Sequence, residues 1–253
     1  MKIFNPARFT RLPDAIMFDT DNTLYAYDPA HKAAHKALRD KVVGAFSIAP
    51  EEFDKAYNEA RRQVKAALNG TASSHSRLLY LQRMLEIMGL GSQVLHALDF
   101  EQTYWRAFLN HAILFDGVRD LLDDIRLHGI PTAIVTDLTA QIQFRKMVYF
   151  GLDRYFDYIV TSEEAGFDKP HAAPFRLAVQ KLRPKGDCIW MVGDNPQHDI
   201  RGGRENVNAV TLQKIHQGAE QGKGENAPDA AFNDFTALRL RIARLADGGA
   251  LRW

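Results

Sequence analysis

The stretch "IMFDTDNTLYAYDP", residues 16–29, decides the fold of this chain. A short apolar run ends there in two aspartates, Asp19 and Asp21, and an asparagine and a threonine follow them. The run over 15–19 is uninterrupted, follows Pro13 closely and gives way to turn-forming residues, which predicts a buried strand. Strands commonly end in a charge, but two carboxylates two residues apart at a turn indicate a more specific arrangement.

The residues after this strand have a helical pattern up to about Ala112, with few β-branched side chains. Pro50 suits the first position of a helix, and two glutamates follow it in the first turn. We expect helices over 30–46, 50–68, 76–90 and 92–112. These four helices form one inserted segment between the first strand and the rest of the chain.

After Gly117 apolar runs alternate with helical runs. We expect strands over 131–137, 156–162, 187–194 and 209–213, and helices over 118–128, 141–152 and 173–182. The polar, glycine-rich residues 214–228 predict a mobile loop, and 229–246 a closing strand and helix. Strands that alternate with helices of this length are typical of right-handed βαβ units and a parallel sheet.

The predicted fold class is therefore α/β, with a Rossmann-like doubly wound parallel sheet as the core and an inserted α-helical domain. Residues 1–25 and 113–253 form the core, and residues 26–112 form the helical domain. The strand runs are continuous rather than alternating, as expected for strands buried on both faces. We expect the insert to act as a lid over the carboxyl edge of the sheet, where open α/β sheets bind ligands.

The composition of the 253 residues, 46% hydrophobic and 25% charged, is that of a globular protein. A net charge of +1 gives no indication of a nucleic-acid partner. The single cysteine, Cys188, allows no internal disulfide and fits a reducing compartment. The start of the chain has no apolar leader, and no run is long enough to span a membrane. We therefore expect a cytoplasmic protein without a membrane partner.

Polar side chains gather where three predicted strands end. They are Asp19 and Asp21 after the first strand, Thr136 and Asp137 after the second, Asp194 and Asp199 after the last, and Lys169 in a turn before a helix. Carboxylates held together repel one another unless a cation lies among them, and Mg²⁺ is the hard cation that oxygen ligands suit. With an ammonium group and a hydroxyl, such a set would stabilise a phosphoryl group in transfer.

These motifs resemble those of the haloacid dehalogenase-like superfamily of phosphohydrolases. "DTDNT" matches its first motif, Thr136 the second, Lys169 the third and "GDNPQHD" the fourth, in the expected order over nearly the whole chain. The helical insert resembles the C1-type cap of this superfamily. The resemblance implies that Asp19 is the nucleophile, which forms an aspartyl-phosphate. Asp21 would be the general acid and then the general base, so Asp19 should be ionised and Asp21 able to hold a proton.

The resemblance also implies a cofactor, Mg²⁺. The Asp19 carboxylate, the Asp21 backbone carbonyl and Asp194 would bind it, and Asp199 would orient one of its waters. Thr136 and Lys169 would hold phosphate oxygens.

Two further residues are candidates for substrate binding. Asp137 stands where close relatives often carry an asparagine, and a carboxylate there would repel phosphate, so we expect it to turn away or to accept a hydrogen bond. Arg77, beside the polar stretch 71–77, could reach a second anionic or sugar group of the substrate.

The resemblance favours a Mg²⁺-dependent phosphatase that acts on a small phosphorylated metabolite, a sugar phosphate or a nucleoside monophosphate. A dehalogenase is disfavoured because Asp21 is present. Lys32 and Lys36 are better explained as solvated lysines than as the Schiff-base lysine of a phosphonate-cleaving enzyme. A phosphoryl-transferring mutase and a binding protein on the same scaffold stay open, and so does the choice between monomer and homodimer.

Overall fold

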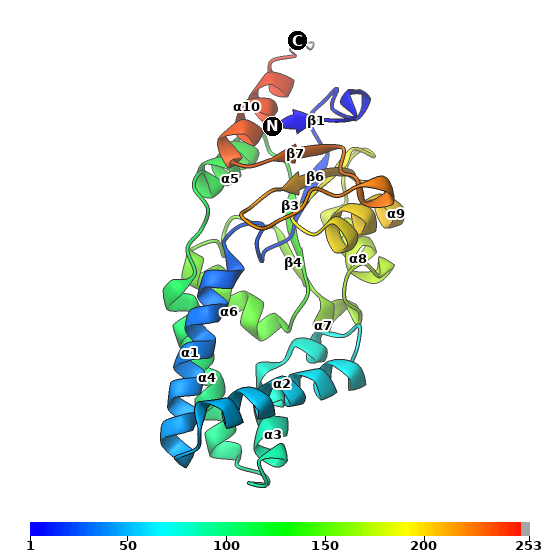
Figure 1. Ribbon diagram of the computed structural model, residues 1–253. Coiled ribbons are helices and arrows are strands. Elements are labelled where there is room, and N and C mark those ends of the chain that lie inside the picture. Colours follow the sequence, from blue (N-terminus) through cyan, green and yellow to red (C-terminus); the bar gives the residue numbers. More distant parts are fainter. Residues whose placement is uncertain (249–253) are drawn as a thin grey trace. The chain divides into compact units, whose positions relative to one another are not determined.

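The computed structural model describes residues 1–248. It contains a seven-stranded sheet with the order β1-β7-β6-β5-β2-β3-β4 (Figure 1). The strands are β1 (Lys2–Ile3), β2 (Ala15–Phe18), β3 (Thr132–Thr136), β4 (Tyr158–Thr161), β5 (Ile189–Gly193), β6 (Val210–Lys214) and β7 (Ala230–Phe232). All neighbouring pairs from β7 to β4 are parallel. The predicted α/β class and its strands are confirmed.

The first strand of the chain differs from the prediction. β1 pairs with β7 in the antiparallel direction, with Lys2 opposite Ala231 and Ile3 opposite Ala230. A strand of two residues is too short to show a period, so it could not be predicted from the sequence pattern. The pairing covers one edge of an otherwise parallel sheet, an edge that would present unpaired backbone groups.

Helices cover both faces of the sheet (Figure 1). They are α5 (Val118–Leu127), α6 (Ala140–Phe150), α7 (Ser162–Ala165), α8 (Ala172–Leu182), α9 (Gly202–Val207) and α10 (Phe235–Ala246). Ala15 and Met17 of β2 pack on one face against Phe175 of α8. The other two side chains of β2 face the opposite side of the sheet, because successive side chains of a strand alternate between its two faces. Helices α5 and α10 pack against each other, and α10 reaches β7.

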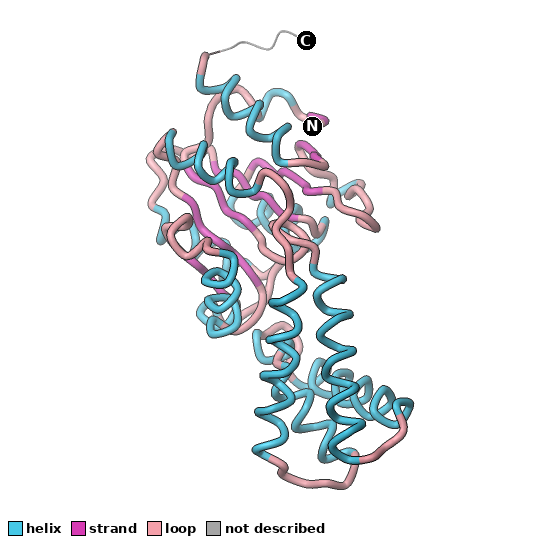
Figure 2. The backbone as a smooth tube through the Cα atoms, turned by 90° about the vertical axis from the view of Figure 1, so that its left-hand side faces the viewer, coloured by secondary structure: helices cyan, strands magenta, loops and turns pink. Residues whose placement is uncertain are grey.

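All regular secondary structure in the inserted segment is helical. It contains α1 (Tyr27–Phe46), α2 (Pro50–Ala67), α3 (Arg77–Ile87) and α4 (Val94–His111), with a short 3₁₀ turn over Ala72–His75. Pro50 is the first residue of α2, and the Ser76 hydroxyl accepts a hydrogen bond from the Leu79 N–H at the start of α3. α1 packs against α4, and α2 against α3. Figure 2 shows helices and loops in this segment and strands in the rest of the chain.

Backbone contacts divide the chain into two compact units. One contains residues 1–26 together with the chain from residue 113 onward, and the other is the helical unit, residues 27–112. Within residues 1–248, no helix is both long and apolar enough to cross a bilayer.

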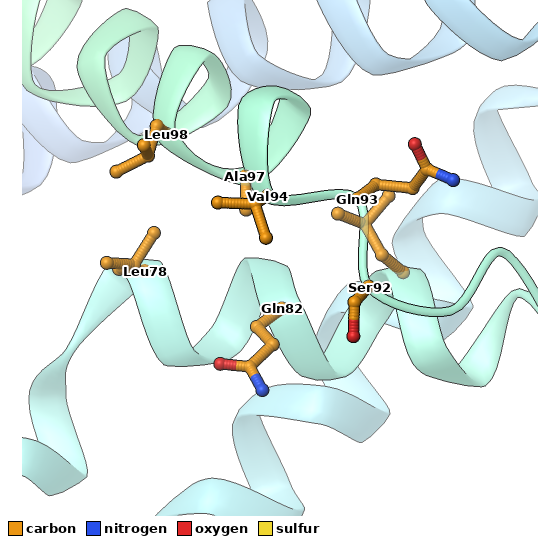
Figure 3. A pocket seen from close by; sticks show the side chains of 8 residues that line it. Leu78, Gln82, Ser92, Gln93, Val94, Ala97 and Leu98 are labelled. Carbon is orange, nitrogen blue, oxygen red and sulfur yellow. The ribbon is translucent and has the colours of Figure 1, made fainter.

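The helical unit contains a cavity of about 220 Å³ between α3 and α4 (Figure 3). Leu78, Val94 and Leu98 line it, together with uncharged polar side chains such as Gln82. A cavity without charged groups cannot balance the charge of a phosphate. The candidate catalytic residues lie in the core unit.

Candidate active site

Three strands of the core end side by side at the candidate site. β2 pairs in parallel with β3 on one side and with β5 on the other, so their carboxyl ends meet at one edge of the sheet. Asp19 directly follows β2, Thr136 is the last residue of β3, and Asp194 directly follows β5. This arrangement brings together side chains that the sequence separates by more than a hundred residues.

Gly193 allows a fourth side chain to reach the same edge. After Asn195 the chain turns through a short π-helix, Pro196–Arg201, whose first turn is held by the Asn195 side chain. The turn returns Asp199 to the end of β5, where a Cβ on Gly193 would lie 2.4 Å from the Asp199 carboxyl carbon. The absence of a side chain at Gly193 therefore permits the close approach of Asp199 at this strand end.

Lys169 joins two of these carboxylates. Its Nζ lies 2.7 Å from Oδ1 of Asp19 and 2.6 Å from Oδ1 of Asp199, and its side chain is 3% exposed. Burial by itself would lower the pKa of Lys169, but the surrounding aspartates raise it well above the ordinary value. The second oxygen of Asp19 accepts a hydrogen bond from the Thr23 hydroxyl at 2.9 Å. Both oxygens of Asp19 are thus held in place.

Asp19, Asp194 and Asp199 form the acidic cluster of the site. One carboxylate oxygen from each lies within 4.8 Å of the others, an arrangement that could hold a metal ion. Burial, with the charges of neighbouring aspartates, raises the pKa of Asp19 to about 7 and that of Asp194 to about 9. Clustered carboxylates with raised pKa values fit a hard divalent cation, because such an ion replaces the protons that otherwise relieve their repulsion. The donor set therefore fits Mg²⁺.

Asp21 points to a different set of partners. Its Oδ1 accepts hydrogen bonds from Lys146 Nζ at 2.8 Å, from the Thr20 hydroxyl at 3.2 Å and from the Tyr25 hydroxyl. Loss of hydration alone would raise the pKa of Asp21, but Lys146 and these hydroxyls lower it below its ordinary value.

The protein's own groups therefore give Asp19 the higher pKa and Asp21 the lower one. The sequence prediction expected the reverse, with Asp19 ionised and Asp21 holding a proton. Asp19 is surrounded by further carboxylates, whereas Asp21 has a lysine as its neighbour. A divalent cation beside Asp19 would add the positive charge that favours its ionised form.

A chain of hydrogen bonds leads to Asp21 from α6. Gln143 Nε2 donates to Thr136 Oγ1 at 2.8 Å, and Thr136 Oγ1 lies 2.9 Å from Thr20 Oγ1. Thr20 Oγ1 donates to Asp21 Oδ1 at 3.2 Å, Thr136 Oγ1 donates to the Asp137 carbonyl at 3.5 Å, and either hydroxyl can donate in the bond between the two threonines. The hydroxyl of Thr136 is thus oriented from one side by Gln143 and from the other by Thr20.

Asp137 makes the hydrogen bond that the sequence analysis expected. Its Oδ1 accepts from the backbone N–H of Lys169 at 2.8 Å, and His198 Nδ1 lies 3.7 Å from its other oxygen. The attraction of Lys169 and His198 outweighs the effect of burial and lowers the pKa of Asp137. The carboxylate therefore ties the Lys169 loop to the end of β3.

Arg77 lies in the helical unit, at the first position of α3. Its guanidinium donates to the Tyr27 hydroxyl at 2.5 Å and to the His75 carbonyl at 2.7 Å. It also lies over the rings of Tyr80, Tyr104 and Trp105, with distances to the ring centres of 5.2 to 5.6 Å. These partners are neutral, so they fix the position of the group without balancing its charge. Its role in substrate binding stays a prediction.

Sequence reasoning missed several residues of this site. Lys146, Tyr25 and Gln143 contact Asp21 or Thr136, and His216 Nε2 lies 3.2 Å from Oδ2 of Asp194. Lys146 had a readable signal, because it occupies the buried face of α6 where the period of the helix predicts an apolar residue. His216 had none, since it lies in a loop whose course only the folded chain sets.

Comparison with known proteins identifies the family. The sequence profile described as haloacid dehalogenase-like hydrolase matches residues 13–206, which include every site residue of the core that the sequence predicted. The chain belongs to the haloacid dehalogenase-like hydrolases. This haloacid dehalogenase-like hydrolase is 36% identical to a ribulose-1,5-bisphosphate 5-phosphatase of Halopiger xanaduensis, over 79% of this chain and 83% of that protein.

A second relative of this hydrolase is the glyceraldehyde 3-phosphate phosphatase of Methanopyrus kandleri. The two are 27% identical over 85% of this chain and 91% of that protein. The predictions of the family and of a phosphatase within it are confirmed.

Solved structures agree with the fold of this hydrolase. The crystal structure of a 2-haloacid dehalogenase from Pseudomonas syringae pv. Tomato superposes with a TM-score of 0.70, covering 92% of this chain and 99% of that one. The two sequences are 22% identical, so this similarity concerns the fold and not the reaction.

Proposed function

We propose that the chain is a Mg²⁺-dependent phosphomonoesterase that hydrolyses a small sugar phosphate through an aspartyl-phosphate intermediate. The observation that carries this proposal is the pair Asp19 and Asp21 at the end of β2. Asp19 lies among Lys169 and two further carboxylates, while Asp21, two residues on, has a separate set of hydrogen-bond donors. A nucleophile and an acid-base group need different surroundings, and a divalent cation beside Asp19 would add the positive charge that keeps the nucleophile ionised.

In the proposed first step, an oxygen of Asp19 attacks the phosphorus atom. As the bond from phosphorus to the substrate oxygen breaks, Asp21 passes a proton to that oxygen and the alcohol leaves. Lys169, 2.7 Å from Asp19, attracts the incoming phosphate and offsets its repulsion by the carboxylate. The Thr136 hydroxyl, set by Gln143, would donate to a phosphate oxygen in place of its bond to Thr20.

In the proposed second step, Asp21 removes a proton from water. The water oxygen attacks the phosphorus, the bond to Asp19 breaks, and inorganic phosphate leaves. The enzyme is then restored with the proton on Asp21.

Asp19, Asp194 and the backbone carbonyl of Asp21 would hold the Mg²⁺ ion, with Asp199 placed to orient a water molecule in its shell. When bound, Mg²⁺ supplies positive charge to the phosphoryl oxygens and lowers the repulsion between phosphate and carboxylates. His216, beside Asp194, would hold that carboxylate in position.

Two relatives support a sugar phosphate as the substrate, since one is named for ribulose 1,5-bisphosphate and the other for glyceraldehyde 3-phosphate. We include Arg77 in this proposal as a contact for a second anionic group. A guanidinium that donates to a hydroxyl and a backbone carbonyl, both neutral, keeps its charge available for an anion. An Arg77→Met variant should therefore raise KM for a sugar bisphosphate more than for p-nitrophenyl phosphate.

Hydrolysis of p-nitrophenyl phosphate with Mg²⁺ and with EDTA tests the reaction class, followed by a screen of sugar phosphates and nucleoside monophosphates. The matched control is Asp19→Asn, which keeps the shape of the side chain but removes the nucleophilic oxygen anion. We expect turnover that requires Mg²⁺ and is abolished by Asp19→Asn. Equal turnover in EDTA, or an active Asp19→Asn enzyme, would contradict the proposal. Silence across the whole screen would favour a mutase or a binding protein.

A further inference from the structure

We propose that Lys146 is a positioning residue that, with Tyr25, anchors one oxygen of Asp21 and leaves its other oxygen to exchange the proton with the substrate. This inference rests on the proposed function, in which Asp21 is the acid-base group. It adds a residue from α6 that lies outside all four sequence motifs.

The hydrogen bonds to the Asp21 side chain fall on one of its two carboxylate oxygens. Lys146 Nζ, the Tyr25 hydroxyl and the Thr20 hydroxyl all donate to Oδ1 of Asp21. A carboxylate oxygen offers about two lone pairs, so three donors leave Oδ1 without capacity for a further proton. The Asp21 side chain is still 34% exposed, which leaves a route from its surface to a ligand. A proton that Asp21 holds for the reaction therefore resides on Oδ2.

The position of Lys146 argues against an incidental contact. Lys146 is 0% exposed, and its Nζ lies 5.6 Å from the centre of the Tyr25 ring. Burying an ammonium group is unfavourable unless it is paired, so an apolar residue on this face of α6 would be the simpler choice for stability alone. The Tyr25 ring packs against Phe150, one helical turn after Lys146. Helix α6 thus fixes both donors relative to each other.

Anchoring Oδ1 decides which oxygen of Asp21 transfers the proton in the reaction. When the bond from phosphorus to the leaving oxygen breaks and the bond to Asp19 forms, the proton moves from Oδ2 of Asp21 to the leaving oxygen, which takes the electron pair of the broken bond. The transfer requires Oδ2 within hydrogen-bond reach of that oxygen. Without Lys146 only the Tyr25 and Thr20 hydroxyls donate to Oδ1, so the carboxyl group of Asp21 is held less firmly and the fraction of molecules with Oδ2 correctly placed falls.

Two esters of similar shape test this inference with the Mg²⁺-bound full-length enzyme. p-Nitrophenyl phosphate releases a stable anion and needs little protonation, whereas benzyl phosphate releases a strongly basic alkoxide unless an acid protonates it. The measurement is kcat/KM for each ester, which reports the steps up to phosphorylation of Asp19. For Lys146→Met we expect a fall of about 100-fold or more with benzyl phosphate and of less than about 10-fold with p-nitrophenyl phosphate. Tyr25→Phe should change the ratio of kcat/KM between the two esters in the same direction, by a smaller factor.

Lys214→Met is the matched control, because Lys214 is also a buried lysine, 2% exposed, which donates to the Ile215 carbonyl and lies over the Phe115 ring. Damage to packing alone should lower kcat/KM for both esters by the same factor, so the ratio between them should stay at the wild-type value. An equal loss for both esters in Lys146→Met and in Tyr25→Phe would overturn the inference. Should Lys146→Met fail to fold, Tyr25→Phe decides alone.

Asp21→Asn separates failure of the inference from failure of the proposed function. It should show the largest selective loss with benzyl phosphate, and adding Lys146→Met to it should change the ratio no further, since the two residues act through one group. A selective loss in Asp21→Asn but not in the Lys146 and Tyr25 variants would reject the role of Lys146 alone. No selective loss in Asp21→Asn, or no turnover of either ester by the wild-type enzyme, would reject the proposed mechanism and this inference with it.

Discussion

The ammonium group of Lys169 lies 2.7 Å from the carboxylate of Asp19, and both side chains are almost completely excluded from water. The same ammonium group reaches Asp199 at 2.6 Å. Buried charges are tolerated when they are paired, and here one cation serves two carboxylates. The candidate nucleophile is therefore held by a residue 150 positions away in the sequence.

Replacing Lys169 by methionine should destabilise the protein as well as inactivate it. The substitution leaves Asp19 and Asp199 buried without their cation, and breaking a buried pair in this way costs about 3–5 kcal/mol. Urea unfolding at neutral pH in EDTA measures the change. Because protonation relieves the remaining carboxylates, the loss should be smaller at pH 5 than at pH 8. A stability equal to the wild type at both pH values would contradict this reading of the ion pair.

Stability without metal should fall as the pH rises from 5 to 9. The pKa values of Asp19 and Asp194 are raised, to about 7 and about 9, so both groups keep a proton in the folded chain that they have lost in the unfolded one. Their contribution to stability is therefore complete at low pH and is lost as the pH rises through these values. Thermal unfolding in EDTA across this range measures the effect.

Mg²⁺ should reverse this trend, because it binds the deprotonated carboxylates. The increase in Tm between EDTA and Mg²⁺ should be larger at pH 8 than at pH 5. Asp194→Asn serves as the control and should reduce both the pH dependence in EDTA and the effect of Mg²⁺. A Tm increase with Mg²⁺ that is the same in wild type and in Asp194→Asn would show that the ion binds elsewhere.

Gly193→Ala should disturb the site although it adds only one methyl group. The new Cβ would lie 2.4 Å from the carboxyl carbon of Asp199, so Asp199 or the end of β5 must shift. Overpacking of this kind costs about 1–3 kcal/mol. We expect weaker Mg²⁺ binding, measured by titration, and a lower Tm. Gly44→Ala in α1 is the matched control, since a Cβ there meets nothing within 4 Å and alanine favours the helix. Equal effects of the two substitutions would contradict the close approach at Gly193.

Gln143→Leu should weaken the hydrogen bond that the Thr136 hydroxyl is proposed to donate to the substrate phosphate. Gln143 is fully buried, and its amide donates to the Thr136 hydroxyl at 2.8 Å and to the Asp137 carbonyl at 3.1 Å. Loss of these donors frees the hydroxyl to turn away from phosphate, which should raise KM by about 10-fold, the equivalent of roughly 1.4 kcal/mol. Steady-state kinetics measure this change. Thr136→Val should cause a similar loss, and the double variant little more; additive losses would show that the two residues act independently.

Most of the fold could be predicted because its signals are local. The apolar runs that became β2, β3 and β5 are continuous, as strands buried on both faces require, and the helical runs between them have the expected period. The antiparallel β1 could not be predicted, because two residues carry no period. The polar residues at the ends of β2, β3 and β5 were readable as a set, since the carboxyl ends of parallel strands meet at one edge of a sheet.

The sequence by itself determined which residue types end each strand and that these residues would converge at one edge of the sheet. Only the tertiary structure decided which groups lie next to them. Lys146 lies beside Asp21, and His216 beside Asp194, because a helix and a loop return to the sheet from distant parts of the chain. Spacing along a chain fixes which face of its own element a residue occupies, but a contact between elements depends on how they pack, and packing is a property of the whole fold.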